Sequence, residues 1–194
     1  MSSLDSEKEF FFFINDKENG FIKKQDANGF ELVVKYLPPT YLAYLEAQKE
    51  IGNGNFLDQY NRLLPEFLSA KTFILTIDPG LNISDPTYYN VGDLSDYKER
   101  IQEMNFNMKD HIYILLGNGK KIFPLSTSME NIYDLQTKKT IYLVFPDNDN
   151  ILSKADLLDF VFEDTFLNTG INHFQFYKKD LDNLPELNFI KNGI

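Results

Sequence analysis

The chain has no cysteine, no tryptophan and only two histidines among its 194 residues. The lack of cysteine excludes disulfide bonds, thiolate catalysis and zinc sites built on cysteine. No apolar run exceeds five residues, whereas a helix that spans a bilayer needs about 20. The sequence therefore predicts no membrane-spanning helix.

Positive charge is also scarce, since 19 basic residues stand against 29 acidic ones and give a net charge of −10. Affinity for nucleic acid comes mainly from basic groups that release counterions, so this balance argues against a nucleic-acid partner. An acidic surface instead suits a basic protein partner. The 18 phenylalanines and 11 tyrosines supply the core of a single domain of this length.

Alternation of apolar and polar residues dominates the last third of the chain, from Leu157 to Leu181, with a break at Asn168-Thr169-Gly170. This pattern predicts two antiparallel strands joined by a turn. The pairs Asn28-Gly29 and Asn118-Gly119 predict two further hairpins, because tight hairpin turns need residues that accept positive φ. Since strands and helices do not alternate regularly, we predict a mainly antiparallel α+β fold. The preferred architecture is a β-sandwich with two or three inserted helices, and a single sheet with helices on one face is the alternative.

The expected organisation is a flexible N-terminal tether over residues 1–8 followed by one globular β-rich domain over residues 9–194. Proline starts one helix at Pro38-Pro39 and ends or kinks another at Pro65. Asp93 or Ser95 is the expected cap of a third helix. The predicted helices are Thr40–Glu50, Phe56–Leu64 and Leu94–Met104, and the predicted strands are Phe10–Ile14, Phe21–Gln25, Phe30–Leu37, Lys71–Ile77, His111–Leu116, Lys121–Leu125, Thr140–Phe145 and the terminal pair.

The two histidines, His111 and His173, are candidates for a general base or a shared metal site. No HxH or HExxH spacing accompanies them, which favours half-exposed strand residues that make local hydrogen bonds. The sequence also contains no convincing cofactor motif. Gly117 to Lys121 superficially resembles a phosphate loop, but it lacks the four-residue gap between the glycines and the Lys-Ser/Thr ending of that motif.

The run Asp147-Asn148-Asp149-Asn150 offers alternating oxygen ligands of the kind that Ca²⁺ prefers. The EF-hand pattern nevertheless fails, since Leu152 stands where glycine is required. A polar turn is the favoured interpretation. A weak calcium site formed by Asp147, Asp149 and Asp156 is the alternative.

The best group of carboxylates is Asp159, Glu163 and Asp164. A pair of them would be needed as acid and base in a glycan hydrolase. Strand alternation places Asp159 and Glu163 on one face and Asp164 on the other. Charges on a solvent-exposed sheet face are the favoured interpretation.

Adjacent tyrosines, Tyr88 and Tyr89, lie in an irregular loop between Asp78 and Gly92. Tyrosine provides amphipathic contact area at a low entropic cost, so such a loop suits ligand binding. Packing of the loop over the helices explains the same residues equally well. We nevertheless take Tyr88 and Tyr89 as the predicted contacts.

The order of segments resembles a group of uncharacterised bacterial exported lipoproteins. The matching pieces are Asn19-Gly20-Phe21, Lys35 to Pro39, Tyr97 to Arg100 before Asn105 to Met108, and Phe162-Glu163-Asp164 with Gly170 and Phe174-Gln175-Phe176. The resemblance implies a place in the bacterial envelope and no known activity. Such proteins carry an export signal and a lipidated cysteine, which this chain lacks, so we hypothesise that Met1 stands where the lipid-bearing cysteine stood.

Together, these patterns predict a non-enzymatic binding domain displayed in the envelope, without cofactor or metal, whose ligand is an unidentified macromolecule, either a protein or a glycan. Contact with a membrane is expected only through a lipid anchor absent from this chain. One alternative is an acidic cytosolic inhibitor or immunity-type protein that masks a basic partner. A less favoured one is the carboxylate-based hydrolase.

Overall fold

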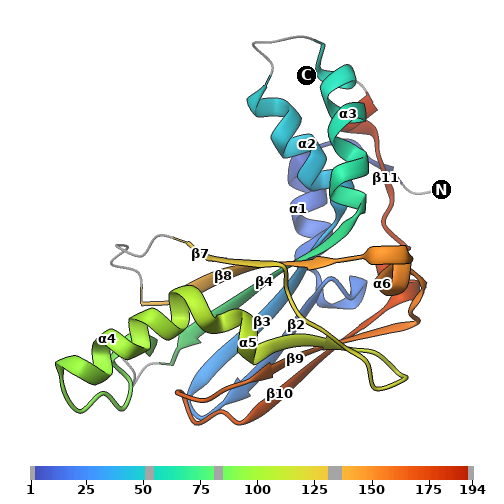
Figure 1. Ribbon diagram of the computed structural model, residues 1–194. Helices are drawn as coiled ribbons and strands as arrows, with labels where there is room; N and C mark the ends of the chain where they lie inside the picture. Colours follow the sequence, from blue (N-terminus) through green and yellow to red (C-terminus); the bar gives the residue numbers. More distant parts are fainter. Residues whose placement is uncertain (1–2, 51–54, 81–84, 131–136, 192–194) are drawn as a thin grey trace.

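The computed structural model describes residues 3–50, 55–80, 85–130 and 137–191. Two antiparallel sheets form the body of the protein (Figure 1), with strand orders β2-β3-β4-β8-β7 and β10-β9-β5-β6. A parallel pair joins β1 to β11. The strands are β1 Ser3–Leu4, β2 Ile22–Ala27, β3 Phe30–Leu37, β4 Ala70–Pro79, β5 Ile112–Leu115, β6 Lys121–Ile122, β7 Ser126–Met129, β8 Lys139–Pro146, β9 Leu157–Glu163, β10 Ile171–Tyr177 and β11 Glu186–Leu187.

Phe73 in β4 shows how the two sheets share one core. Its fully buried ring lies 5.8 Å from that of Phe145 in its own sheet. It also lies 5.5 Å from the ring of Phe160 and 5.1 Å from that of Phe176, both in the other sheet. The two-residue rhythm of each strand sends its aromatic side chains toward this interface. The predicted antiparallel α+β sandwich is therefore confirmed.

The three predicted helices are present, and two of them, α2 and α3, project together from one end of the sandwich (Figure 1). They pack through Ala43, Ala47 and Leu63. Pro65 was expected to end or kink α3, but the helix continues to Leu68. Partly buried Leu64 and Phe67 pack against the same cluster, so tertiary contacts sustain the helix beyond the proline. The helices are α1 Glu7–Asn15, α2 Pro39–Lys49, α3 Phe56–Leu68, α4 Leu94–Gln102, α5 Met108–His111, α6 Ile151–Lys154, α7 Lys178–Leu181 and α8 Asn188–Lys191.

The predicted strand Phe10–Ile14 is instead part of helix α1. Ser6 caps the helix by accepting a hydrogen bond from the backbone N–H of Glu9 at 3.2 Å. Phe10 and Ile14 are buried, whereas Phe11 and Phe12 are exposed, which is the spacing of one helix face. An unbroken apolar run carries no period, so the sequence could not distinguish helix from strand here.

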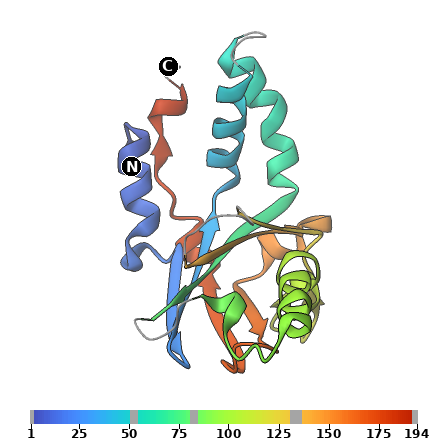
Figure 2. The same cartoon turned by 90° about the vertical axis from the view of Figure 1, so that its left-hand side faces the viewer.

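The expected tether over residues 1–8 is corrected in part. Ser3 and Leu4 pair with Glu186 and Leu187 near the other end of the chain, and Figure 2 shows the two terminal segments side by side. The Asn188 side chain also donates a hydrogen bond to Asp5 at 2.7 Å. Residues 3–8 therefore belong to the folded domain, while Met1 and Ser2 lie outside the described residues.

Helix α4 begins where predicted, and Asp93 rather than Ser95 is its cap, since Asp93 Oδ1 accepts from the backbone N–H of Ser95 at 2.7 Å. A π-helical turn, Glu103–Asn107, links α4 to α5. His111 ends α5 and does not open a strand as expected. The predicted strand from Lys121 to Leu125 is confined to β6. Nowhere in the described ranges is a helix both long and apolar enough to cross a bilayer.

Candidate binding surface

The turn that carries Tyr88 is built by Asp85. One carboxylate oxygen of Asp85 accepts hydrogen bonds from the backbone N–H and the hydroxyl of Thr87, at 2.8 and 2.7 Å. The other oxygen forms an ion pair with Lys139 at 3.0 Å. Pro86 and Thr87 are buried, and their burial holds the short 3₁₀ turn Pro86–Tyr88 in place.

The structure separates the two predicted contact residues. Tyr88 is 58% exposed, and its ring stacks on that of Tyr97 at 4.7 Å with an interplanar angle of 16°. Tyr89 is partly buried, with its hydroxyl accepting a hydrogen bond from the Asn28 side chain at 2.9 Å. Its ring meets Phe30 edge-on at 5.1 Å. Tyr88 is therefore presented to solvent, while Tyr89 anchors the loop.

Arg100 ties the loop to helix α4. Its guanidinium donates to the backbone carbonyls of Pro86 and Tyr89, at 3.2 and 3.1 Å, and lies 5.0 Å from the centre of the Phe166 ring. The hydroxyl of Tyr88 raises the pKa of Tyr97 by hydrogen bonding. The ring stack and the bonds from Arg100 therefore connect the turn that carries Tyr88 to helix α4.

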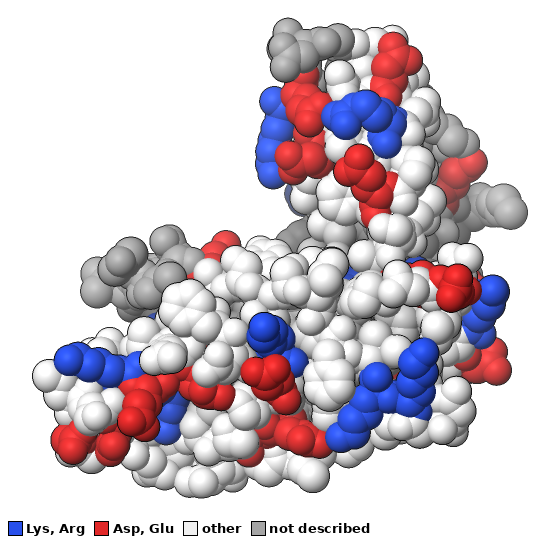
Figure 3. Space-filling view, in the orientation of Figure 1, with Lys and Arg blue, Asp and Glu red and all other residues white. Residues whose placement is uncertain are grey.

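Helix α4 extends sideways from the sandwich (Figure 1), and none of its residues is buried. Leu94, one helical turn before Tyr97, is 67% exposed. Asp96 and Glu99 border a hollow of about 290 Å³ beside Arg100. Figure 3 shows acidic and basic side chains together over this helix. We call the group formed by Tyr88, Leu94, Tyr97, Asp96 and Glu99 the α4 surface.

The histidines do not share a site. His173 Nδ1 lies 2.8 Å from Asp159 Oδ2, as expected for a half-exposed strand residue with a local partner. His111 pairs instead with Glu103, from the π-helical turn. Within the described ranges, no three histidine or acidic side chains are grouped so as to hold a metal ion.

The predicted carboxylate pair, Asp159 and Glu163, has the wrong geometry for glycan hydrolysis. Four residues along a strand span roughly 13 Å, whereas the acids of glycosidases stand about 5–9.5 Å apart. Glu163 accepts from the Tyr113 hydroxyl at 2.5 Å and pairs with Lys121 at 3.3 Å, and these contacts lower its pKa. A general acid needs a raised pKa, so Glu163 is also unsuited to that role.

Asp164 lies beyond β9 and not on the strand face with Phe160 and Phe162 where it was expected. It caps the turn to β10 by accepting hydrogen bonds from the backbone N–H groups of Phe166, Leu167 and Thr169, at distances from 2.7 to 3.0 Å. The turn chemistry of aspartate explains this residue without a catalytic role.

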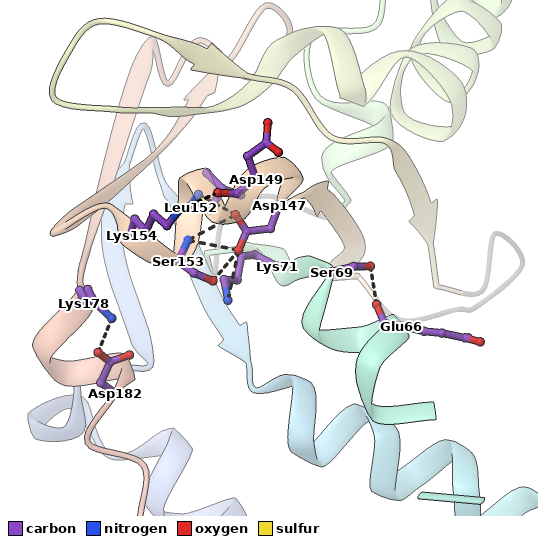
Figure 4. A network of polar contacts seen from close by, with 10 residues as sticks. All are labelled: Glu66, Ser69, Lys71, Asp147, Asp149, Leu152, Ser153, Lys154, Lys178 and Asp182. Carbon is purple, nitrogen blue, oxygen red and sulfur yellow. Dashed lines mark hydrogen bonds and ion pairs between the residues drawn. The ribbon is translucent and has the colours of Figure 1, made fainter. Parts of the chain in front are cut away.

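Asp147 also has a structural role, visible in Figure 4. Its buried carboxylate accepts from the backbone N–H of Leu152 at 2.7 Å and from the hydroxyl of Ser153 at 2.5 Å. Its nearest charged neighbour is Lys71. A carboxylate surrounded by hydrogen-bond donors is a poor calcium ligand, so the structure argues against the alternative interpretation, a weak calcium site at Asp147, Asp149 and Asp156.

Tyr97 belongs to this surface and Arg100 supports it, but neither was predicted from the sequence as a site residue. Tyr97 has the spacing of an ordinary helix stripe with Ile101 and Met104. Its contact with Tyr88 depends on the path of the intervening loop, for which the sequence contains no local signal.

Comparison with protein-family models, curated proteins and solved structures finds no match to this chain. The resemblance to exported lipoproteins therefore stays a prediction.

Proposed function

We propose that this protein is a non-enzymatic binding domain whose α4 surface holds a protein partner with a basic, partly apolar face. The observation that carries the proposal is the exposed Tyr88–Tyr97 stack on a loop fixed by Asp85 and Arg100. Ordering such a loop before binding reduces the entropy that association would otherwise lose.

The chemistry of the α4 surface supports a protein ligand. Tyrosine and leucine side chains supply the apolar contact area typical of interface centres, and acidic side chains supply a charged rim. Asp96 and Glu99 add to a chain whose net charge is −10, so attraction favours a partner of opposite charge. Envelope display and cytosolic inhibition of a basic protein are two versions of this proposal, and they differ only in where the partner is found.

The test starts with the purified protein immobilised and exposed separately to envelope and cytosolic extracts of the source cells. A captured protein is then identified, purified and measured against the isolated chain. We expect Tyr88→Ala to weaken this binary affinity by about tenfold or more, as truncation of an interface tyrosine does. Raising the salt concentration should weaken it further, because salt screens exposed charges.

Tyr177→Ala is the matched control, since Tyr177 is an exposed tyrosine on β10, away from α4. Tyr88 is better changed alone than together with Tyr89, because loss of Tyr89 would also remove its contacts with Asn28 and Phe30. Equal affinities for the wild type, Tyr88→Ala and Tyr177→Ala would show that the α4 surface is not the binding site.

A further inference from the structure

A hollow of about 100 Å³ lies between helices α6 and α7 and strands β3, β4 and β9. Its polar lining consists of Tyr36, Lys71, Ser153, Lys178 and Asp182. A polar cavity needs about 10–15 Å³ for each water that it holds, so this space is large enough for several waters or one small polyatomic ion. None of these residues belongs to the α4 surface.

Lys71 brings a buried positive charge to this hollow. Its side chain is only 12% exposed, and its ammonium lies 3.7 Å from Asp147 Oδ2, farther than a hydrogen bond. Figure 4 shows the amino group pointing toward the side where Lys178 and Asp182 lie. Burial lowers the pKa of Lys71, and Asp147 opposes that effect. Within the described ranges, the long contact with Asp147 is the ion pair that this ammonium forms.

Asp147 does not satisfy Lys71, because its oxygens are already occupied. Oδ1 accepts from the backbone N–H of Leu152 at 2.7 Å. Oδ2 accepts from the backbone N–H and the hydroxyl of Ser153, at 3.1 and 2.5 Å. The remaining donors of the ammonium face the hollow, where a water molecule or a ligand can accept from them.

Tyr36 presents a second hydrogen-bond donor to the same hollow. The residue is only 5% exposed, and in the part of the chain that the structure describes its hydroxyl has no hydrogen-bond partner. Burial raises its pKa, with smaller contributions from Asp147 and Asp182, so the phenol stays protonated and able to donate.

Lys71 and Lys178 bring two positive charges to the hollow, Asp182 brings one carboxylate to its lining, and Asp147 lies behind Lys71. Lys178 pairs with Asp182 across one turn, and both side chains are partly exposed at the mouth of the hollow. An exposed pair of this kind is weak and exchanges readily with other ions. Lys178 can therefore turn to a ligand without disturbing the core.

We propose that this hollow binds a small oxyanion, a phosphate or a carboxylate, with the Lys71 ammonium and the Tyr36 hydroxyl as its principal contacts. The ligand would accept from both donors in place of water, and Lys178 would add a second positive charge. An oxyanion accepts several such charge-assisted hydrogen bonds at once, whereas a neutral apolar ligand would leave both donors unsatisfied.

The test is titration of the folded chain with inorganic phosphate and, separately, with sodium acetate, against sodium chloride at matched ionic strength. Backbone amide shifts of Ser153 and Ala155, together with the melting temperature, report occupancy. We expect saturable changes with at least one oxyanion at millimolar concentration. Lys71→Met and Tyr36→Phe should each weaken that affinity by about tenfold, the effect of losing one hydrogen bond in a charged contact.

Lys154→Met is the control for charge, because Lys154 lies on α6 and donates to the Asp149 carbonyl without lining the hollow. Its affinity for the oxyanion should equal that of the wild type. Tyr36→Phe removes only a hydroxyl, so it keeps the test decisive if Lys71→Met does not fold. Responses to phosphate and acetate no larger than to chloride, or an equal loss in Lys154→Met, would overturn the proposal.

Discussion

Replacing Asp147 by alanine should destabilise the protein far more than replacing its ion-pair neighbour Lys71 by methionine. The Asp147 side chain is fully buried and accepts hydrogen bonds from the backbone N–H groups of Leu152 and Ser153 and from the Ser153 hydroxyl. Lys71 has only the 3.7 Å contact with this carboxylate. The two partners of one ion pair therefore contribute unequally to folding.

The magnitudes follow from these contacts. Asp147→Ala leaves buried donors without an acceptor and Lys71 without a counter-charge, and breaking a buried pair in this way costs about 3–5 kcal/mol. For a chain of this length that corresponds to a melting temperature lower by about 6–20 °C. Lys71→Met loses a long ion pair but also removes the desolvation cost of the lysine, so its effect should be about 1 kcal/mol or less.

The assay is urea unfolding at pH 7 followed by circular dichroism, with the free energy of unfolding taken from linear extrapolation. Asp156→Ala is the control, because Asp156 is an exposed aspartate of the same segment and should change stability by less than about 0.5 kcal/mol. Equal losses for Asp147→Ala and Lys71→Met would refute the assignment of Asp147 as the organising residue of this region.

Three further outcomes are expected. Asp164→Ala should cost about 2–4 kcal/mol in urea unfolding, because the turn loses every bond that Asp164 accepts, including the one from the Thr169 hydroxyl; a loss below 0.5 kcal/mol would contradict this. Burial lowers the pKa of Lys35 to about 8 from an ordinary 10.5, so the unfolded chain binds more protons between these values and stability rises there with pH. Between pH 8 and 10, the free energy of unfolding of the wild type should rise by about 1 kcal/mol relative to that of Lys35→Met, after allowance for solvent screening. A difference between the two proteins that does not change with pH would refute the burial argument. Carboxyl NMR titration should give Glu163 a pKa below its ordinary value. Tyr113→Phe should raise this pKa, because it removes the Tyr113 hydrogen bond that lowers it most; an unchanged pKa would show that the hydrogen bond is not the cause.

Local rules predicted the strands and the hairpins well. Asn28 and Gly29 adopt φ values of 49° and 83°, as the tight turn between β2 and β3 requires. Strand β10 alternates exposed and buried residues throughout, in register with β9. These features depend on neighbours one or two residues apart, so their signals are present in the sequence itself.

The errors have a different origin, because they involve residues that are far apart in the chain. Phe10–Ile14 became a helix face because Tyr41 and Phe189 pack against Phe10, at ring distances of 4.0 and 6.4 Å. Residues 3–8 were not a tether, since β11 offers a partner to β1. Local periodicity contains no information about such partners.

The candidate sites divide in the same way. The sequence suggested Tyr88 and Tyr89 together as contacts, and it provided no reason to distinguish the two or to add Tyr97. It also gave no sign that Tyr36 and Lys71 line one hollow with residues more than 75 positions away.

By itself, the order of amino acids determined which residues turn, which alternate and which charge dominates, because those properties arise between near neighbours. Only the tertiary structure decided which side chains meet. Packing of distant segments exposes Tyr88 and pairs each histidine with a different acidic side chain. It also places the Lys71 and Tyr36 side chains as donors in the lining of one hollow.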